Sequence, residues 1–161
     1  MQKTPKLKYF ATLNVAVGLP QEIGVSLHGE RRVIPILGGT AQGEGWKGNI
    51  LNGGADYQLI LTPRMAHLDA HYVIELESEL ESELDNGERI YIHNKAIRVA
   101  SAEVTKKLKI SKAVDPELIY FRCHPTFETS SSAMQWITER VFVGTGVRRP
   151  DSVELQFFEI L

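Results

Sequence analysis

The chain has 161 residues, 43% of them hydrophobic and 24% charged, and a net charge of −2, which is typical of one soluble globular domain at residues 1–161. The small net charge provides no basic surface for nucleic acid, and no apolar run approaches the ~20 residues that cross a bilayer. The N-terminus lacks a signal-peptide pattern, and the single cysteine, Cys123, excludes an internal disulfide. We therefore expect a cytoplasmic protein with no nucleic-acid or membrane partner.

The first segments of the chain show the two-residue alternation of side chains that is typical of β-strands. Residues 7–17 (LKYFATLNVAV) place every second residue from Leu7 to Val17 on one face, and a glycine and a proline follow. A second strand is expected at 31–37, where Arg32 shares a face with two isoleucines.

Glycines dominate residues 31–58. Glycine suits positions where the backbone takes φ > 0 or passes close to another strand, so this segment predicts a strand, a bend, a short strand at 46–51 and a second bend. The polar triplet Asp56-Tyr57-Gln58 follows. Because the segment contains no GxxxxGK[ST] pattern and no helix follows it, it indicates a pocket rather than a phosphate-binding loop.

The middle of the chain predicts two strands and a connection. Strands are expected at 55–62 and 67–76, and in the second Tyr72 and its apolar neighbours face away from Asp69 and His71. The acidic run 77–87 is either a solvated connection ending in an Asn-Gly turn or an acidic patch for cations or partners. Scattered acids without an ordered loop make poor metal sites, which favours the connection.

The second half of the chain supplies one clear helix, at 102–110, with Ser101 as its N-cap and apolar residues spaced by four. At least eight short strands with frequent turns are typical of an antiparallel sandwich or a closed barrel, and a barrel of about eight strands can hold one small ligand. The remaining elements are strands at 88–94, 118–124, 139–147 and 152–161 and a short helical turn near 133–138.

Six motifs run in order over nearly the whole chain: RRVIPILGGTAQG, ILNGGADYQ, LDAHY, IYIHNKAIR, YFRCHPTFET and WITERVFVGTGVRRPDSVELQFFEIL. In these motifs the chain resembles the uncharacterised protein family three-one-one, also called domain of unknown function thirty-two thirty-seven. The resemblance implies a single compact β-barrel of lipocalin- or streptavidin-like appearance, often dimeric, and it supplies no established activity. His71, where the family pattern has arginine, and Tyr57, where tryptophan is common, depart from the pattern and would alter a pocket.

Two arginines are candidates for anchoring the polar end of a ligand. Arg32 lies beside isoleucines and Arg122 lies beside Tyr120, and we assign both strand faces to the barrel interior. A buried guanidinium keeps its charge and therefore needs an anion. That anion is either Asp56 or Glu128 in a structural ion pair, or the carboxylate or enolate of a ligand.

Three residues are candidates for acid–base catalysis. Asp56 and Gln58 point the same way out of the glycine turn, as a general base and a hydrogen-bonding positioner would. Alternatively, Asp56 caps the turn through its own backbone. Asp69 and His71, two apart on one strand, form either a carboxylate-oriented imidazole or a solvent-facing pair on the outside of the barrel.

Metal binding has little support in the sequence. The five histidines are scattered, and His67 and His71, four apart on a strand, lie about 13 Å apart, which is too far for one ion. Neither an HExxH nor a CxxC motif occurs. Cys123 points away from His124 on a strand and is interpreted as a small core residue. We expect neither a metal nor a cofactor.

These observations predict a barrel that binds a small aromatic or carboxylated organic molecule. As an enzyme it would be a cofactor-independent isomerase, lyase or cyclase that acts by proton transfer. The alternatives are a non-catalytic ligand-binding protein and a structural barrel whose function lies in a homodimer surface. Asn94 is either a polar anchor or a strand-end residue, and the aromatic residues are either core or ligand wall. The predicted catalytic residues are Asp56, Asp69 and His71, and the predicted ligand-binding residues are Arg32, Gln58, Tyr72, Tyr91, Asn94, Arg122, Glu128 and Trp136.

Overall fold

A computed structural model describes residues 2–77 and 87–161, so most of the expected acidic connection at 77–87 lies outside the described residues. The described chain is mainly strand, with one α-helix, α1 (Ala102–Lys109), and two short 3-10 helices, η1 (Pro116–Leu118) and η2 (Gln135–Glu139). The strands are β1 (Leu7–Val17), β2 (Gln21–Ser26), β3 (Gly29–Gly43), β4 (Trp46–Ile50), β5 (Ala55–Thr62), β6 (Met65–Leu76), β7 (Arg89–Val99), β8 (Tyr120–Thr129), β9 (Phe142–Arg148) and β10 (Ser152–Ile160).

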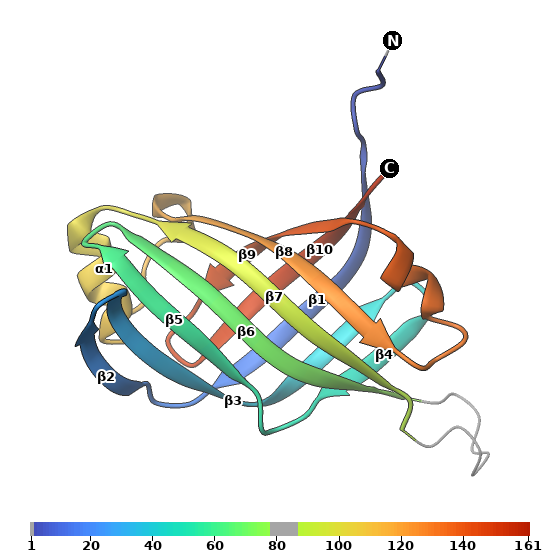
Figure 1. The fold of residues 1–161 in the computed structure, drawn as a ribbon, viewed down its shortest axis with the longest axis horizontal. Helices are drawn as coiled ribbons and strands as arrows, with labels where there is room; N and C mark the ends of the chain where they lie inside the picture. Colours follow the sequence, from blue (N-terminus) through green and yellow to red (C-terminus); the bar gives the residue numbers. More distant parts are fainter. Residues whose placement is uncertain (1, 78–86) are drawn as a thin grey trace.

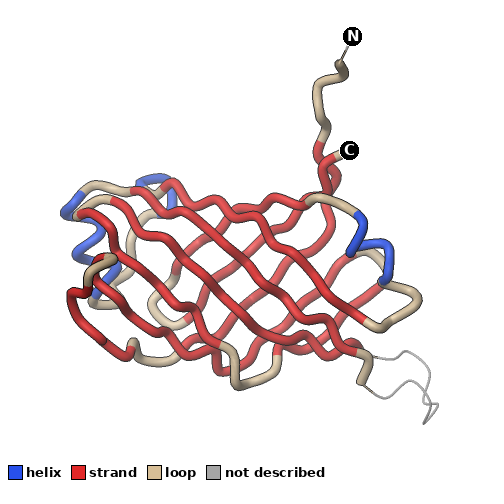
Figure 2. Tube along the Cα trace, viewed as in Figure 1, coloured by secondary structure: helices blue, strands red, loops and turns tan. Residues whose placement is uncertain are grey.

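The strands form one antiparallel sheet that closes into an eight-strand barrel (Figure 1, Figure 2). β1 pairs with β10 on one side and with β3 on the other, which closes the wall. β4 and β5 both lie between β3 and β6 and share one position in the wall. The predicted all-β barrel with one short helix is therefore confirmed.

The helix α1 forms as the sequence predicts. The Oγ of Ser101 accepts a hydrogen bond from the backbone N–H of Val104 (3.1 Å), which satisfies one of the free donors of the first turn. Val104 and Leu108 are buried against Ala100. Figure 1 shows α1 and β2 at one end of the barrel and the segment that contains η2 at the other. No helix in the described ranges combines the length and the apolar character needed to cross a membrane.

Several strands run further than the sequence predicts. β7 continues from 94 to Val99, and β8 continues from 124 to Thr129 with Pro125 inside it, opposite Asn94. β2 was not predicted, because its residues are mostly exposed on both faces and show no alternation. Proline and polar residues therefore interrupt the sequence pattern without interrupting the strands.

A β-bulge in β1 changes which residues face the interior. The register between β1 and β10 shifts between Tyr9 and Ala11. An extra residue at a bulge inverts the alternation. Phe10 and Ala11 are consequently both buried, whereas Leu7 and Tyr9, which simple alternation would place on the same face as the buried Leu13, are exposed.

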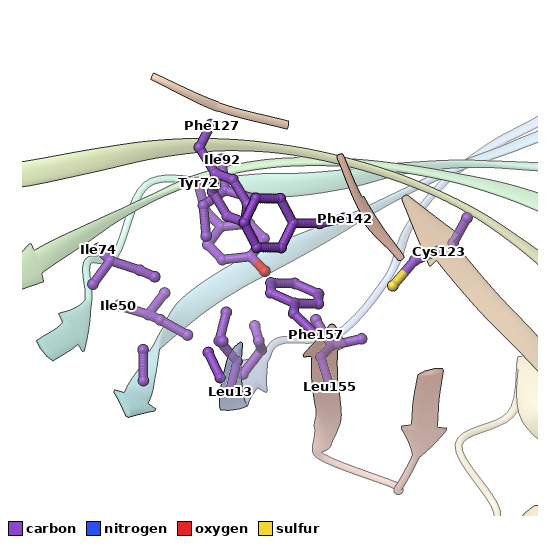
Figure 3. Packing of buried hydrophobic residues seen from close by; sticks show 14 of the residues in the cluster. Leu13, Ile50, Tyr72, Ile74, Ile92, Cys123, Phe127, Phe142, Leu155 and Phe157 are labelled. Atoms are coloured by element: carbon purple, nitrogen blue, oxygen red, sulfur yellow. The ribbon is translucent and has the colours of Figure 1, made fainter. Parts of the chain in front are cut away.

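The end of the barrel toward η2 is filled by aromatic side chains. The ring of Phe10 lies 4.9 Å from that of Phe142 and 5.5 Å from that of Trp136, centroid to centroid. Phe127 packs edge-on against Phe142 at 5.1 Å. Figure 3 shows Phe127, Phe142 and their neighbours turned toward one another between the strands. This packing leaves the opposite half of the barrel as the place for a site.

Candidate functional site

The half of the barrel toward α1 contains a partly polar cavity. About 50 Å³ is available to the centres of water molecules, which is room for about three to five waters at the ~10–15 Å³ that each requires. Apolar side chains form most of the wall. The polar and charged lining residues are Asp56, Gln58, Tyr72, Asn94, Arg98 and Arg148.

Asp56, predicted as a catalytic base, lies in the wall of this cavity. It is the second residue of β5, and its Oδ1 accepts a hydrogen bond from the backbone N–H of Asp69 on β6 (2.9 Å), so the carboxyl bonds across to β6 rather than capping its own turn. Burial raises the pKa of the carboxyl to about 6, against the opposing effects of the Asp69 N–H and the Arg98 guanidinium. Asp56 therefore titrates close to neutral pH.

Two arginines that the sequence analysis did not single out bring positive charge to the cavity. Arg98 on β7 is buried, and its Nη2 has no hydrogen-bond partner among the described residues. Burial lowers the pKa of Arg98 to about 10, and Asp56 opposes this effect. Arg148 ends β9, is half-buried and donates to the carbonyl oxygen of Ser152 (3.2 Å). Burial lowers the pKa of Arg148, and the charge of Arg32 adds to this.

Three neutral side chains complete the polar lining, and all three were predicted as ligand-binding residues. Gln58 Nε2, the Tyr72 hydroxyl and Asn94 Oδ1 are buried and lack a hydrogen-bond partner within residues 2–77 and 87–161. Burial raises the pKa of Tyr72 above its usual range, so the hydroxyl stays protonated and can donate. Figure 3 shows this hydroxyl among the inward-pointing side chains. A buried polar group without a partner costs about 1–3 kcal/mol, so these atoms are suited to bind a ligand or ordered water.

Arg32 is buried, as its strand face predicts, but protein groups already occupy its donors. Its Nε donates to Glu22 Oε1 (2.8 Å), its Nη1 donates to Gln58 Oε1 (3.1 Å), and its Nη2 donates to the carbonyl oxygen of Lys109 (2.9 Å). These bonds tie β2, β5 and the end of α1 to β3. The ion-pair partner is thus Glu22 rather than Asp56 or Glu128, because β2, which the sequence did not predict, supplies it.

Asp69 and His71 lie together on the outer face of the barrel, which was one of the two alternatives. His93 on β7 lies directly opposite His71 and joins them. Asp69 Oδ1 lies 2.5 Å from His93 Nε2 and 3.2 Å from His71 Nε2. The hydroxyl of Tyr91, another predicted ligand-binding residue, lies 2.6 Å from His71 Nδ1. This outer group of four side chains does not line the cavity.

Three further predicted ligand-binding residues lie away from the cavity. Arg122, which we assigned to the interior, is exposed, and its guanidinium lies over the ring of Tyr120, 4.8 Å from the centroid. Glu128 is exposed on the same face of β8. Trp136 is 41% exposed and packs against Phe10 at the η2 end.

The burial patterns of β7 and β8 explain why the sequence analysis missed Arg98 and placed Arg122 in the interior. In β7 every second residue up to Arg98 is buried, so ending the predicted strand at 94 concealed this arginine. In β8 Phe121 and Cys123 are buried, and Arg122 between them therefore points outward. Nothing in the sequence marks Arg148, because its segment resembles a turn.

Comparisons with known proteins agree with the motif resemblance. A UPF0311 protein of Rhodopseudomonas palustris strain TIE-1 is 38% identical over 161 residues, which cover 100% of both chains. The crystal structure of a conserved protein of unknown function from Rhodopseudomonas palustris superposes with a TM-score of 0.88 at 36% identity, over 99% of this chain and 100% of that one. An enzyme from Penicillium herquei superposes with a TM-score of 0.70 over 100% of this chain and 98% of its own, but at 18% identity the likeness shows the fold alone. Residues 5–160 match the model of the family described as protein of unknown function (DUF3237), and the chain therefore belongs to this family.

Proposed function

We propose that the barrel binds a small organic molecule with a carbonyl or carboxylate group in its cavity, and that Asp56 exchanges a proton with this molecule. The observation that carries the proposal is a carboxyl group with a pKa of about 6 in the same cavity as four buried polar atoms without partners in the described chain. A general base is most effective when its pKa lies near the operating pH. The reaction class is cofactor-independent proton transfer, as in an isomerase, lyase or cyclase.

The unpaired atoms suit a carbonyl compound. Arg98, Tyr72 and Gln58 offer donors, and Asn94 offers an acceptor. When the Asp56 carboxylate removes a proton from the carbon next to a carbonyl, negative charge develops on the carbonyl oxygen. Donors fixed around that oxygen in a cavity with mainly apolar walls stabilise this charge. Return of the proton to another atom of the molecule completes an isomerisation. In a ring closure, the carbanion instead attacks a second carbonyl carbon of the same molecule, the electrons of that C=O bond move to its oxygen, and this oxygen takes the proton.

The charges around the cavity favour an anion. One carboxyl and two guanidiniums line it, from Asp56, Arg98 and Arg148. When all three are ionised, the lining carries one net positive charge, which a carboxylate or enolate would neutralise. Arg98 and Arg148 thus take the anchoring role that the sequence suggested for Arg32 and Arg122.

The size of the cavity limits what it holds. Its volume of about 50 Å³ is a third of the ~150 Å³ of an engineered apolar cavity that binds benzene. It accommodates the reacting group of a ligand and few further atoms. Arg148 both lines the cavity and is partly exposed, so a larger ligand would enter past its side chain.

A binding protein without turnover is the second candidate, because the same cavity would serve it. Binding alone requires no group that titrates near neutral pH, so the pKa of Asp56 favours the catalytic role. A purely structural barrel would need a protein partner for every inward polar group, and the four cavity atoms that lack one among the described residues do not meet that condition. The homodimer stays a prediction.

Proton exchange of small enolisable compounds in D2O, followed by proton NMR, tests the proposal. Pyruvate is an anionic probe and acetone is a neutral one. The wild-type protein should accelerate loss of the methyl signal of pyruvate more than that of acetone. Asp56→Asn should reduce the acceleration at least about a hundredfold, because general acid–base catalysis contributes 10²–10⁴-fold.

Two arginine variants provide the matched control. Arg98→Met should raise the KM for pyruvate, whereas Arg122→Met, which removes an exposed arginine on the outer face, should change neither KM nor kcat. Saturable binding of pyruvate without exchange would favour the binding protein. Equal exchange rates in the wild type and Asp56→Asn would contradict the catalytic role of Asp56.

A further inference from the structure

The outer face of β6 and β7 carries a second group of chemically active side chains, separate from the cavity. Asp69 and His71 belong to β6, and His93 lies opposite His71 in the ladder. The two imidazole rings stack with their centroids 4.0 Å apart and their planes 18° apart. The register of the two strands thus brings His93 to two residues that lie 22 and 24 positions earlier in the sequence. Spacing along a single strand, which we used to argue against metal binding, does not reveal this group.

The two histidines direct the same type of atom at the same carboxylate. His71 Nε2 lies 3.2 Å and His93 Nε2 lies 2.5 Å from Asp69 Oδ1. One ligand atom from each residue lies within 4.8 Å of the other two. Around an ion with bonds of 2.0–2.2 Å, tetrahedral ligand atoms lie about 3.3–3.6 Å apart. The His71–Asp69 distance of 3.2 Å is close to this range, and the His93–Asp69 distance of 2.5 Å requires the partly exposed His93 ring to move by about 1 Å.

Neighbouring aromatic residues hold His71 in place. The Tyr91 hydroxyl is within 2.6 Å of His71 Nδ1, and the ring of Tyr57 packs against His71 at 6.0 Å between centroids. A histidine that binds a metal through one nitrogen usually donates its other N–H to an oxygen. If Tyr91 accepts from Nδ1–H, the lone pair of His71 Nε2 points toward Asp69 and is available to a cation.

We propose that Asp69, His71 and His93 form a site for a divalent transition-metal ion of the Zn²⁺ type. Two imidazoles and one carboxylate are the donors that Zn²⁺ and related ions use, and hard ions such as Mg²⁺ and Ca²⁺ prefer oxygen alone. All three ligands come from one face of the wall and are between 29% and 43% exposed. The remaining coordination positions therefore face solvent and are open to water or to a small anionic ligand.

Titration calorimetry of the untagged, chelator-treated protein with ZnCl2 tests this site. The wild type should bind one Zn²⁺ per chain. His71→Ala and His93→Ala should each weaken binding at least about a hundredfold, because each removes a ligand, and Tyr91→Phe should weaken it about tenfold through the orientation of His71. The matched control is His67→Ala, which removes an exposed histidine from the same face of β6 and should bind as the wild type does.

Two further measurements distinguish binding at these three residues from Zn²⁺ binding elsewhere on the protein. Co²⁺ bound by these ligands should give a visible absorption band that disappears in Asp69→Asn. Asp56→Asn, which removes the proposed base of the cavity but no ligand of the outer site, should still bind one Zn²⁺ per chain, so the metal site and the proposed proton transfer can fail separately. Wild-type protein that binds no Zn²⁺, or a Zn²⁺ affinity equal in the wild type, His71→Ala and His93→Ala, would overturn the proposal. Circular dichroism of each variant shows whether it is folded, and Asp69→Asn replaces any alanine variant that is not.

Discussion

The backbone N–H of Asp69 donates a hydrogen bond to Oδ1 of Asp56 at 2.9 Å. The main chain of Asp69 therefore holds the carboxyl of the cavity, while its side chain lies on the other face of the wall with His71 and His93. The negative charge of Asp69 also contributes to the raised pKa of Asp56. A cation bound by Asp69 would neutralise that charge, so occupation of the outer site should lower the pKa of Asp56 and favour its basic form.

Asp56→Asn should stabilise the protein above pH 6 and have little effect near pH 4. The pKa of Asp56 rises from 3.8 to about 6 on folding. Between these values the folded state binds more protons than the unfolded state, so stability falls as pH rises through this window. A shift of about two units corresponds to at most about 3 kcal/mol. Asparagine keeps an acceptor for the Asp69 N–H without the charge, and we expect a gain of about 1–3 kcal/mol at neutral pH.

Urea unfolding at a series of pH values measures this difference. The control is Glu128→Gln, which removes an exposed carboxylate from β8 and should change the stability by less than about 0.5 kcal/mol at each pH, as is usual for surface substitutions. An Asp56→Asn variant that is less stable than the wild type at neutral pH would show that the charge is stabilising, contrary to the pKa argument.

Arg98→Met should raise the pKa of Asp56 further. Arg98 is the main positive charge that favours the ionised carboxyl, and methionine removes it while filling similar apolar volume. Carbon-13 NMR of the labelled aspartate carboxyl groups follows the titration directly. Arg122→Met, on the outer face, should leave the titration where it is. An unchanged Asp56 pKa in Arg98→Met would mean that the two groups do not interact.

Cys123 should react slowly with thiol reagents in the folded protein. Its side chain is buried in the core, and burial raises the pKa of the thiol to about 12. The thiolate is the reactive form, and little of it exists at neutral pH. Reaction with a chromogenic disulfide should become fast only after unfolding in urea. Rapid reaction of the native protein would place the thiol within reach of solvent.

The sequence predicts the fold of this chain better than its site. Alternation identified the barrel strands and the inward direction of Tyr72, and the glycine turn identified Asp56. The sequence pattern could not reveal Glu22 as the partner of Arg32, because β2, which contains Glu22, lacks an alternating pattern. The other contacts between residues on different strands depend on how the strands pair when the barrel closes.

The group of Asp69, His71 and His93 depends on the pairing of the strands. His71 meets His93 only because β6 and β7 align in a particular register, and a shift by one residue would turn one histidine to the other face. Register in turn depends on bulges, such as the one between Tyr9 and Ala11. Local patterns in the sequence do not specify bulges of this kind, so they predict strand faces and leave cross-strand neighbours undetermined.

Arg32→Met should destabilise the protein by about 2–4 kcal/mol. Arg32 is 2% exposed, and its loss leaves Gln58 Oε1 and the Lys109 carbonyl without their donor and breaks the ion pair with Glu22. Arg31→Met is the control, because Arg31 donates a hydrogen bond near the surface, to the carbonyl oxygen of Tyr57. This substitution should cost under about 1 kcal/mol. Urea unfolding measures both changes, and equal losses would show that the three-way anchor of Arg32 is not important for stability.

Gly39→Ala should be among the most damaging single changes in the barrel. Gly39 takes φ +142° where β3 passes β1, and a Cβ there would lie 2.0 Å from the carbonyl oxygen of Asn14. The backbone of β1 would have to move, which we expect to cost at least about 3 kcal/mol from overpacking and backbone strain together. Gly45 also has a positive φ (+75°), but its Cβ would meet open space. Gly45→Ala should therefore cost only about 1–2 kcal/mol, the strain of the left-handed conformation alone. Thermal unfolding of the two variants separates the steric effect from the conformational one, and similar melting temperatures would show that β1 and β3 are not so closely packed at this bend.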